Sequence, residues 1–510
     1  MVNKEYYKKY LLFLAFVSGM AIMAVEISAS RLLAPYFGTS TFVWTNIIGV
    51  IMAALAIGYY IGGKMADRKP HLEVILKIII IACLILFSIS FITRPLVEYI
   101  TGNMMLWHSA SLMIFFGSLF TVAILFIFPI ILLGAVSPFI IKLLSQESTA
   151  IGHNAGMVFS ISTVGSILGT FLPTLVFVPY LGTRKTIIFF SLLLFCTAIF
   201  GLLKRKWLII CYACLFFLLI PKFPAIKAQD GAIFEDESVY QYFQVADENN
   251  LRLLKVNEGL GTFSIINIKP GQIMTGSYFD YYNILPYLNG NEKKQDVLIL
   301  GLAGGTTSTQ YNYFFGKDYD LHIDGVEIDD KVISTAEKYF NLNNSSLTVY
   351  NFDGRNFLDY LDKKYNSIII DVYSNQLYIS FHLTTHEFFD SVNKHLKPKG
   401  IVAMNVNAVS PDSPILKNIT NTMLLSFKNV YIIPIKNGAW NFMVLASENE
   451  IEFTDLNKIE NIELYPIFTD TINAVEKVSY DNNFGYLTDD KAPIEHLTDK
   501  MIMDFIFNSM

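Results

Sequence analysis

The sequence predicts two folds in one chain: an α-helical membrane bundle in the first half, and an α/β domain preceded by a small antiparallel β-sheet in the second. Three observations carry this prediction. Hydrophobic residues make up 53% of the 510 residues and charged residues only 16%, which is too apolar for a wholly soluble protein. Up to Ile220 the chain has 15 Lys and Arg against 6 Asp and Glu, whereas the remainder has 23 against 38. From residue 296 onward, strand-like apolar runs alternate with helix-like segments, a pattern typical of a doubly wound, mostly parallel sheet.

Apolar stretches long enough to cross a membrane recur along the first half. A span needs about 17 to 25 apolar residues. Seven stretches are predicted as spans: 11–33, 43–63, 74–92, 111–133, 155–179, 186–203 and 207–221. Pro129 and Pro138 interrupt the fourth apolar run, which favours a kinked helix or a helix with a re-entrant piece. Residues 1–221 are therefore expected to form a multi-span domain in the cell membrane, with the lipid bilayer as a partner.

Basic residues in the short loops indicate the orientation of the spans. Lysines precede the first span, and residues 64–69 hold further Lys and Arg between the second and third, so both places are expected to be cytoplasmic. Residues 204–206 fit this alternation, but a true seventh span over 207–221 would then place the second half outside the cytoplasm. That run has about 14 residues, a length at which an interfacial segment competes with a span. Whether the number of spans is six or seven, and therefore on which side of the membrane the second half lies, stays open.

Two features of the predicted spans suggest roles beyond anchoring. The stretch Gly62–Arg68 resembles the loop after the second span of major facilitator transporters. Glu26 and Arg31 lie in or near the first span, where ionisable groups are costly, so they are interpreted as a mutual ion pair or as a contact with substrate or lipid. All four cysteines lie in apolar segments of the first half, which leaves the second half without a disulfide framework or a cysteine-based metal site.

After Pro221 and Pro224 the patterning becomes that of a soluble protein. Residues 222–290 are predicted as a small β-sheet subdomain, and residues 291–510 as the α/β domain. The expected strands are 296–302, 320–328, 347–352, 366–373 and 400–406, with helices near 330–341, 354–362 and 385–397. The acidic balance of this half argues against nucleic acid as a partner and favours cationic or neutral small molecules.

Four predicted strands end in residues suited to binding a ligand, and ligands bind beyond the carboxyl ends of such strands. The first strand ends in small residues from Gly301 to Thr307, which let backbone N–H groups approach a ligand. The second ends in Glu327, at a spacing where nucleotide-binding folds hold two ribose hydroxyls. Asp353, with Gly354 behind it, and Asp371 end the next two strands. The alternatives are a solvated acid at Glu327, a simple turn at Asp353, and a capping or salt-bridge role for Asp371.

The order and spacing of these strand ends resemble the Rossmann-like S-adenosylmethionine-type fold, and the flanking sequence resembles the spermidine synthases, or polyamine aminopropyltransferases. The matching stretches are SVYQYF from Ser238, YFD at 278–280 before Leu285 and Pro286, YNSIIIDVYS around Asp371, and HLTTHEFFDSVNKHLKPKGIVAMNV from His382. LTDDKAP at 487–493 is similar to a signature of the membrane-fused members. The resemblance covers roughly residues 235–500.

This resemblance implies a reaction and roles for particular residues. It implies transfer of an aminopropyl group from decarboxylated S-adenosylmethionine, the co-substrate, to putrescine or a related amine, with no permanently bound cofactor and no metal. Asp371 would accept the proton, and Tyr278 would position the amine. Asp280 would attract the cationic amine, and Gln241 would contact the nucleoside. The remaining nucleoside-binding residues would be Gly301, Gly304, Glu327, Asp353 and Gly354. A homodimer is also expected, with the catalytic domain on the cytoplasmic face, where the nucleoside is supplied.

Departures from the family pattern define the alternatives. Gly304 stands where the soluble enzymes have an Asp for the amine of the nucleoside, and Phe279 and Ser374 replace two polyamine contacts. The loop from Ser374 to Ser380 lacks the usual Asp-Pro. One alternative is a methyl- or aminocarboxypropyl-transferase that uses intact S-adenosylmethionine. Another is a transporter whose C-terminal domain is a catalytically silent nucleoside sensor.

Overall fold

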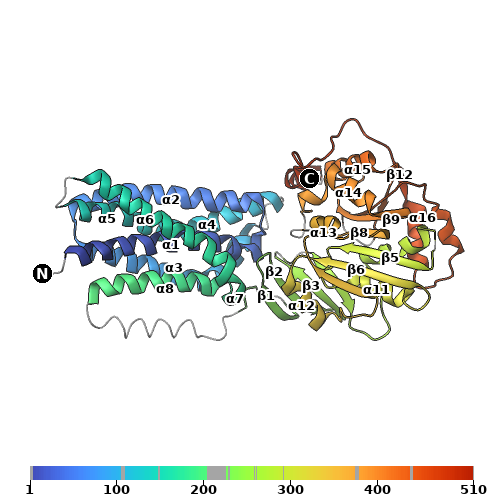
Figure 1. The fold of residues 1–510 in the computed structure, drawn as a ribbon, viewed down its shortest axis with the longest axis horizontal. Coiled ribbons are helices and arrows are strands. Elements are labelled where there is room, and N and C mark those ends of the chain that lie inside the picture. Colours follow the sequence, from blue (N-terminus) through green and yellow to red (C-terminus); the bar gives the residue numbers. More distant parts are fainter. Residues whose placement is uncertain are drawn as a thin grey trace. The chain divides into compact units, whose positions relative to one another are not determined.

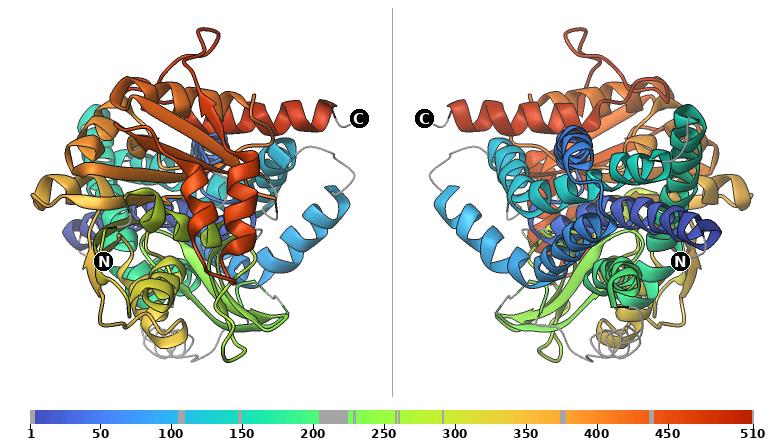
Figure 2. Two further views of the ribbon diagram at one scale, coloured as in Figure 1. Left: turned by 90° about the vertical axis from the view of Figure 1, so that its right-hand side faces the viewer. Right: turned by 90° about the vertical axis from the view of Figure 1, so that its left-hand side faces the viewer.

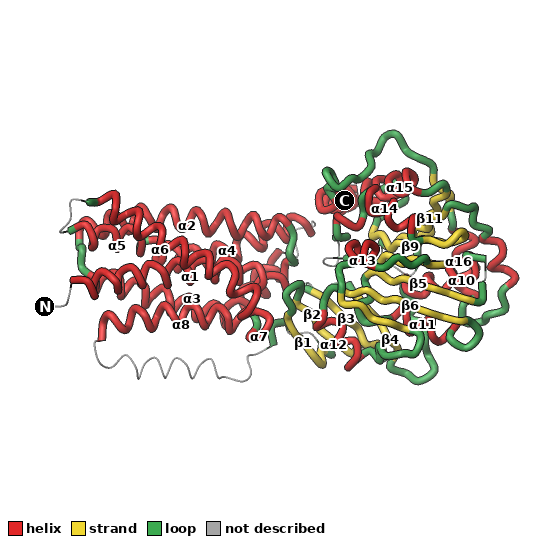
Figure 3. The backbone as a smooth tube through the Cα atoms, viewed as in Figure 1, coloured by secondary structure: helices red, strands yellow, loops and turns green. Residues whose placement is uncertain are grey.

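The chain divides into two compact units (Figure 1). The computed structural model of the protein describes residues 4–104, 110–146, 150–203, 225–227, 230–257, 259, 261–290, 292–373, 378–436 and 440–508. The first unit comprises Met1–Ala228 with Glu235–Tyr242, and the second comprises Gln229–Phe234 with Phe243–Met510. Coloured by secondary structure, the described part of the chain up to Leu203 consists of helices joined by short loops, and strands appear only after it (Figure 3).

The first unit is a bundle around helix α1. Its helices are α1 (Lys4–Phe37), α2 (Thr41–Arg68), α3 (Leu72–Met104), α4 (Ala110–Gly134), α5 (Val136–Ser145), α6 (Ile151–Leu172), α7 (Val178–Leu181) and α8 (Thr183–Leu203), with a π-helical turn η1 (Pro173–Phe177) between α6 and α7. Helix α1 contacts α2, α4, α5, α6 and α8, which explains why most of its apolar residues are buried.

Six helical stretches among the described residues are long and apolar enough to cross a membrane. They are Lys4–Phe37, Thr41–Arg68, Leu72–Thr101, Ile114–Ser145, Ile151–Leu181 and Thr183–Leu202. The first six predicted spans overlap these six stretches in order, and helix α5 forms the end of the fourth stretch after α4. The predicted seventh span, 207–221, lies outside the described residues.

Small residues bring the helices of the bundle together. A Cβ atom on Gly165 would lie 2.0 Å from the backbone oxygen of Phe16, and one on Gly58 would lie 2.4 Å from that of Ile131. Such close packing is how helices associate in lipid, where burial of apolar surface gives little drive. In the facilitator-like stretch, Asp67 pairs with Lys142 of α5, with 2.8 Å between the Asp67 oxygen and the Lys142 nitrogen.

The predicted pair of Glu26 and Arg31 does not form. Glu26 is buried, at 8% exposure, and within the described part of the chain no hydrogen bond or ion pair involves its side chain. Five residues apart on one helix, the two side chains point about 140° away from each other, because each residue turns the helix by about 100°. The interpretation of this pair as a structural ion pair was therefore wrong.

A four-stranded sheet in the order β1-β2-β3-β4 precedes the large sheet in the chain, formed by β1 (Ala232–Glu237), β2 (Tyr242–Glu248), β3 (Leu251–Val256) and β4 (Thr262–Asn267). The strands β2, β3 and β4 pair antiparallel, as their alternating patterns predict. Phe243 and Val245 of β2 pack with Ala303 and Phe340 of the following α/β fold. The small sheet therefore lies against the loop after the first parallel strand.

The large sheet has eight strands in the order β12-β10-β11-β9-β8-β5-β6-β7. Five are parallel: β5 (Lys294–Leu300), β6 (Asp320–Glu327), β7 (Leu347–Asn351), β8 (Tyr365–Ile370) and β9 (Leu396–Asn407), which confirms the five predicted strands. The structure adds an antiparallel extension that was not predicted: β10 (Asn429–Pro434), β11 (Asn441–Ser447) and β12 (Glu476–Val478).

Alternate residues of each central strand pack into different cores. Ile368 and Ile370 join one core, and Ile369 of the same strand joins the other. Helices on both faces complete these cores (Figure 2), which is why the central strands are almost wholly apolar. The helical segments are η2 (Tyr278–Ile284), α10 (Leu285–Leu288), α11 (Thr306–Phe315), α12 (Asp330–Tyr339), α13 (Gly354–Tyr360), η3 (Phe381–Leu383), α14 (His386–Lys394), α15 (Pro414–Ser426), η4 (Phe453–Lys458), α16 (Tyr465–Ala474) and α17 (Ile494–Asn508).

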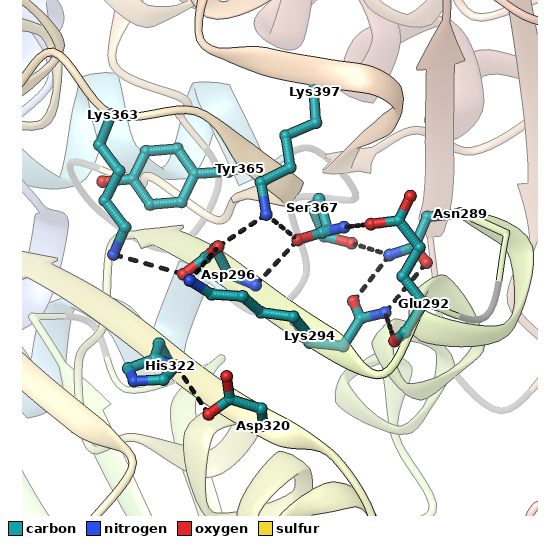
Figure 4. A network of polar contacts seen from close by, with 12 residues as sticks. Asn289, Glu292, Lys294, Asp296, Asp320, His322, Lys363, Tyr365, Ser367 and Lys397 are labelled. Atoms are coloured by element: carbon teal, nitrogen blue, oxygen red, sulfur yellow. Dashed lines mark hydrogen bonds and ion pairs between the residues drawn. The ribbon is translucent and has the colours of Figure 1, made fainter.

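A polar network ties the amino ends of the parallel strands together (Figure 4). Asp296 of β5 pairs with Lys397 of β9 at 2.6 Å, and Lys294 and Lys363 lie 3.8 Å from its carboxylate. Burial works to raise the pKa of Asp296, but the three lysines outweigh it and lower that pKa. This network leaves the opposite, carboxyl edge of the sheet for a ligand.

Candidate active site

The predicted site residues Gly301, Glu327 and Asp371 meet at the carboxyl edge of the sheet. The parallel register sets Leu300 beside Val326 and Ile370, so the residues that follow these strands are neighbours. The amide of Asp371 donates to the Leu300 carbonyl at 3.0 Å, and the amide of Gly301 donates to the Val326 carbonyl at 3.0 Å. This edge is the topological switch point, because β5 lies between β6 and β8.

The loop after β5 requires glycine at two positions. Gly301 has φ +84°, and a Cβ atom there would lie 2.2 Å from the backbone oxygen of Asp371. Gly305 has φ +78° and precedes the first turn of α11. Both conformations are rare for residues with a side chain. The loop thus runs close beneath Asp371 and turns directly into a helix whose amino end can face a polar ligand.

Glu327, the last residue of β6, is buried and oriented by two backbone amides. Its Oε2 accepts from the amide of Ala303 at 2.9 Å, and its Oε1 accepts from the amide of Asp329 at 3.1 Å. Burial raises the pKa of Glu327 to about 7, although these hydrogen bonds act against the rise. Each carboxylate oxygen can accept more than one hydrogen bond, so capacity remains for hydroxyl donors of a ligand.

Asp353 follows β7 and caps α13, while Gly354 is the first residue of that helix. The Asp353 Oδ1 accepts from the amides of Arg355, at 3.1 Å, and Asn356, at 3.0 Å. Its Oδ2 lies 3.3 Å from Nε2 of His382. A Cβ atom on Gly354 would only touch Leu300, at 3.6 Å, so space alone does not require glycine here. Oδ1 of Asp353 thus caps the helix, and Oδ2 keeps some capacity to accept a hydrogen bond from a ligand.

Asp371 is the most distinctive group at this edge. Its Oδ2 accepts from the hydroxyl of Tyr278 at 3.0 Å, and its Oδ1 accepts from the amide of Asn405 at 3.3 Å. Burial raises the pKa of Asp371 to about 6, and the hydrogen bonds from Asn405 and Tyr278 limit the rise. A carboxylate with such a pKa is ionised at neutral pH yet close enough to it to accept a proton during a reaction.

Side chains that the sequence reasoning missed surround Asp371. Asn405 is itself held by Asn441, whose side-chain nitrogen donates to the Asn405 oxygen at 2.9 Å. The hydroxyl of Tyr373 donates to the backbone oxygen of Asn405 at 3.1 Å. The buried hydroxyl of Tyr282 lies near Asp371, whose charge adds to the rise that burial causes in the pKa of Tyr282. A polar residue inside an apolar run, such as Asn405 in β9, was the sequence signal that could have identified these site residues.

The structure gives a physical reason for the glycine at position 304. The amide of Gly304 donates to Oγ of Ser264, in β4, at 2.7 Å. A Cβ atom at position 304 would lie 2.7 Å from the Ser264 Cβ and 3.2 Å from the Phe340 ring. The small sheet therefore fills the space into which an Asp side chain at this position would project.

The structure does not bring every predicted residue to this edge. Asp280 accepts from the amide of Gly276 at 2.7 Å, from Thr275 and from Nε2 of Gln310 at 2.6 Å. Its carboxylate is thus occupied by local structure, unlike the prediction that it attracts a cationic amine. Gln241 precedes β2 in the first unit. Ser374 lies outside the described residues, and so does part of the loop up to Ser380.

No group of three or more His, Cys, Asp or Glu side chains arranged to hold a metal ion occurs in the part of the chain that the structure describes. The polar groups at this edge are instead carboxylates, hydroxyls and amides, set in a frame of backbone N–H groups. Such a set recognises a neutral or cationic organic molecule by hydrogen bonding.

Comparison with known proteins agrees with this geometry. The model of the spermine/spermidine synthase domain matches residues 285–455, which include β5 to β11 and the carboxyl edge described above. This part of the chain is thus similar to the spermine/spermidine synthase domain. Its homologues are named polyamine aminopropyltransferases.

Two relatives show how far this similarity extends. A probable polyamine aminopropyl transferase of Bifidobacterium longum is 30% identical over 296 residues, which cover 53% of this chain and 64% of the relative. Polyamine aminopropyltransferase 2 of Aquifex aeolicus is 22% identical over 470 residues, covering 88% of this chain and 90% of the relative. Among solved structures, a probable spermidine synthase from Corynebacterium glutamicum matches with a TM-score of 0.39 and 17% identity, covering 50% of this chain and 92% of that one.

Proposed function

We propose that the spermine/spermidine synthase domain transfers an aminopropyl group from decarboxylated S-adenosylmethionine to a small amine such as putrescine. The observation that carries this proposal is the half-buried pair of Asp371 and Tyr278, joined at 3.0 Å at the switch point of the sheet. A reaction of this type needs a base in a site from which water is excluded. Asp371 is half-buried and has the raised pKa that suits such a base.

The nucleoside would lie along the neighbouring strand ends. Glu327 would accept hydrogen bonds from the two ribose hydroxyls, and Asp353 would accept one from the amino group of the base. Gly301 and Gly305 would allow the backbone to approach the ligand closely. These roles agree with the orientation of both carboxylates by backbone amides, which leaves oxygen lone pairs available.

The chemistry follows from the state of the acceptor amine. An alkylammonium has a pKa near 10.4, so its nitrogen lone pair is occupied at neutral pH. Asp371 would hold the amine and accept its proton while the nitrogen attacks the aminopropyl carbon. The carbon–sulfur bond breaks, its electron pair neutralises the sulfonium, and methylthioadenosine leaves. Tyr278 would fix the carboxylate during this step, and the hydroxyl of Tyr282, near the same carboxylate, would contact the amine.

A second candidate is a transferase that uses intact S-adenosylmethionine. Ser264 and Phe340 fill the space beside Gly304, so no carboxylate from this position opposes the carboxylate of the intact nucleoside. Methyl or aminocarboxypropyl transfer would then be the reaction. Asp371 would serve as the base in either case.

The helical unit would place this enzyme in a membrane. Its six apolar stretches have the length and composition of spans, and we propose a multi-pass protein of the cell membrane whose catalytic domain faces the cytoplasm. A cytosolic supply of the nucleoside is the reason for choosing that face. Accessibility of an introduced cysteine in the exposed residue Asp320 to an impermeant reagent, in intact and opened cells, tests this placement.

Product analysis tests the proposed reaction. The full-length protein is incubated with putrescine and either form of the nucleoside, and the products are identified by mass spectrometry. We expect spermidine and methylthioadenosine in equal amounts from the decarboxylated nucleoside only, and their loss in an Asp371→Asn variant. A methylated or aminocarboxypropylated amine formed from intact S-adenosylmethionine would support the second candidate instead.

A further inference from the structure

His382 lies against one oxygen of Asp353, the carboxylate that would meet the base of the nucleoside. The capping bonds to the amides of Arg355 and Asn356 use Oδ1 of Asp353, and His382 lies against Oδ2 at 3.3 Å. The hydrogen bond from His382 is the main reason why the pKa of Asp353 is lowered, since burial acts in the opposite direction. His382 therefore helps to keep this carboxylate ionised and able to accept.

The position of His382 is fixed from behind. Nη1 of Arg355 donates to the backbone oxygen of His382 at 3.0 Å. The same guanidinium forms two hydrogen bonds of 2.6 Å with the carboxylate of Asp489, which also accepts from the hydroxyl of Thr385 at 2.8 Å. Asp489 belongs to the stretch 487–493, whose role the catalytic residues do not explain. Segments of the chain more than 100 residues apart thus converge to hold the backbone of His382 in place.

We propose that His382 is a positioning residue for recognition of the nucleobase. It holds Oδ2 of Asp353 in one orientation and leaves a lone pair of that oxygen free for the exocyclic amino group of a purine. The torsion that turns a carboxyl group is broad, so Oδ1 and Oδ2 are not fixed by the rotamer alone. This inference rests on the proposed function, because it requires a purine nucleoside at this edge of the sheet.

The consequence is selectivity for an amino-purine over an oxo-purine. An amino group donates to the free lone pair of Oδ2, whereas a carbonyl oxygen in its place would face the carboxylate with no donor between them. A site built to accept a hydrogen bond discriminates strongly against an analogue that lacks the donor. Loss of His382 leaves the acceptor present but less well oriented, which predicts weaker discrimination and not its complete loss.

The test compares two nucleosides on the full-length protein. Calorimetry measures the dissociation constants of methylthioadenosine and of its 6-oxo analogue, methylthioinosine, for wild type, His382→Ala and His382→Gln. We expect the wild type to prefer the amino form at least about tenfold, the value of one well-made hydrogen bond. In His382→Ala this preference should fall about threefold, whereas the Gln variant, whose amide can donate to Oδ2, should restore most of it.

A matched control comes from the other end of the sheet. His322 also faces an aspartate, with its Nδ1 3.6 Å from Asp320, but it lies at the amino end of β6 (Figure 4). His322→Ala should leave both dissociation constants unchanged. A further readout is the split between KM and kcat: His382→Ala should raise KM for the nucleoside while kcat stays at the wild-type value.

Each outcome decides a different point. An unchanged preference in His382→Ala, or a Gln variant as poor as the Ala variant, would overturn the positioning role of His382. A wild type that binds both nucleosides equally would overturn it as well. A wild type that binds neither nucleoside would refute the proposed function itself, and the inference would fail with it.

Discussion

Replacing Asp371 by Asn separates the catalytic role of this carboxylate from its effect on stability. Asn has nearly the same shape, but it cannot accept a proton. A general base contributes about 10²- to 10⁴-fold to a rate, so kcat should fall by about that factor. Nucleoside affinity should stay close to the wild-type value, because Glu327 and Asp353 are untouched.

Stability should change in the opposite direction. The folded protein holds the pKa of Asp371 at about 6, against an ordinary value of 3.8, because of burial. At neutral pH, carrying this charge in the folded state costs roughly 3 kcal/mol, since each unit of pKa corresponds to about 1.4 kcal/mol. The new amide faces the Asn405 side chain, where two donors meet at a cost of about 1 kcal/mol. A net stabilisation of about 2 kcal/mol should remain, measured by denaturant unfolding of the second unit.

The pH dependence has a definite sign. Because the folded pKa of Asp371 lies above its unfolded value, the cost of its charge is absent below about pH 4, grows between about pH 4 and 6, and is constant above that range. In wild type, kcat/KM for the amine should fall tenfold per pH unit below about pH 6. An Asp320→Asn variant, with its exposed carboxylate at the amino end of β6, serves as the control. Turnover by Asp371→Asn within tenfold of wild type, or a loss of stability in that variant, would refute this reasoning.

Three further variants test the surroundings of Asp371. Tyr278→Phe removes the hydroxyl that binds Oδ2, so kcat/KM for the amine should fall about tenfold and the acid limb of the pH profile should move to higher pH; unchanged steady-state kinetics would contradict the role of this hydroxyl. Glu327→Gln should weaken nucleoside binding about 10- to 100-fold, because backbone amides face both oxygens and the new NH2 group would meet a donor in either orientation. Calorimetry measures this, and an unaltered dissociation constant would remove Glu327 from the nucleoside site. Gly304→Asp would introduce the residue that the soluble enzymes have at this position. Because Ser264 occupies the space, this substitution should lower the free energy of unfolding by about 1 to 3 kcal/mol. A variant as stable as wild type with higher activity would show that the small sheet moves to make room for the Asp side chain.

The sequence was most informative where strand direction decides position. Parallel strands bring their carboxyl ends to one edge, so residues that follow separate strands, such as Gly301, Glu327 and Asp371, become neighbours whatever the intervening helices do. The two-sided burial of Ile368 to Ile370 was equally readable, because a strand covered on both faces is continuously apolar. These features depend on the chain pattern and not on single contacts.

Other features depend on contacts that no local pattern encodes. Asp280 was predicted to face a cationic substrate, but an acid beside a turn can equally bind the amides of that turn, and here it binds those of Thr275 and Gly276. The antiparallel strands β10 and β11 are continuously apolar, which does not reveal their direction. The role of Asn405 depends on Asn441, because the Asn441 side chain donates to the Asn405 oxygen. The two residues lie on β9 and β11, which meet only in the folded sheet.

Equilibrium binding of the two nucleosides to the full-length protein tests the central claim most directly. Decarboxylated and intact S-adenosylmethionine compete for the strand ends around Asp371, and calorimetry gives both dissociation constants. The account predicts clear preference for the decarboxylated form, with an affinity that falls in Glu327→Gln and persists in Asp371→Asn. Preference for the intact form would move the protein out of polyamine synthesis, and binding of neither form would contradict the assignment of this edge as a nucleoside site.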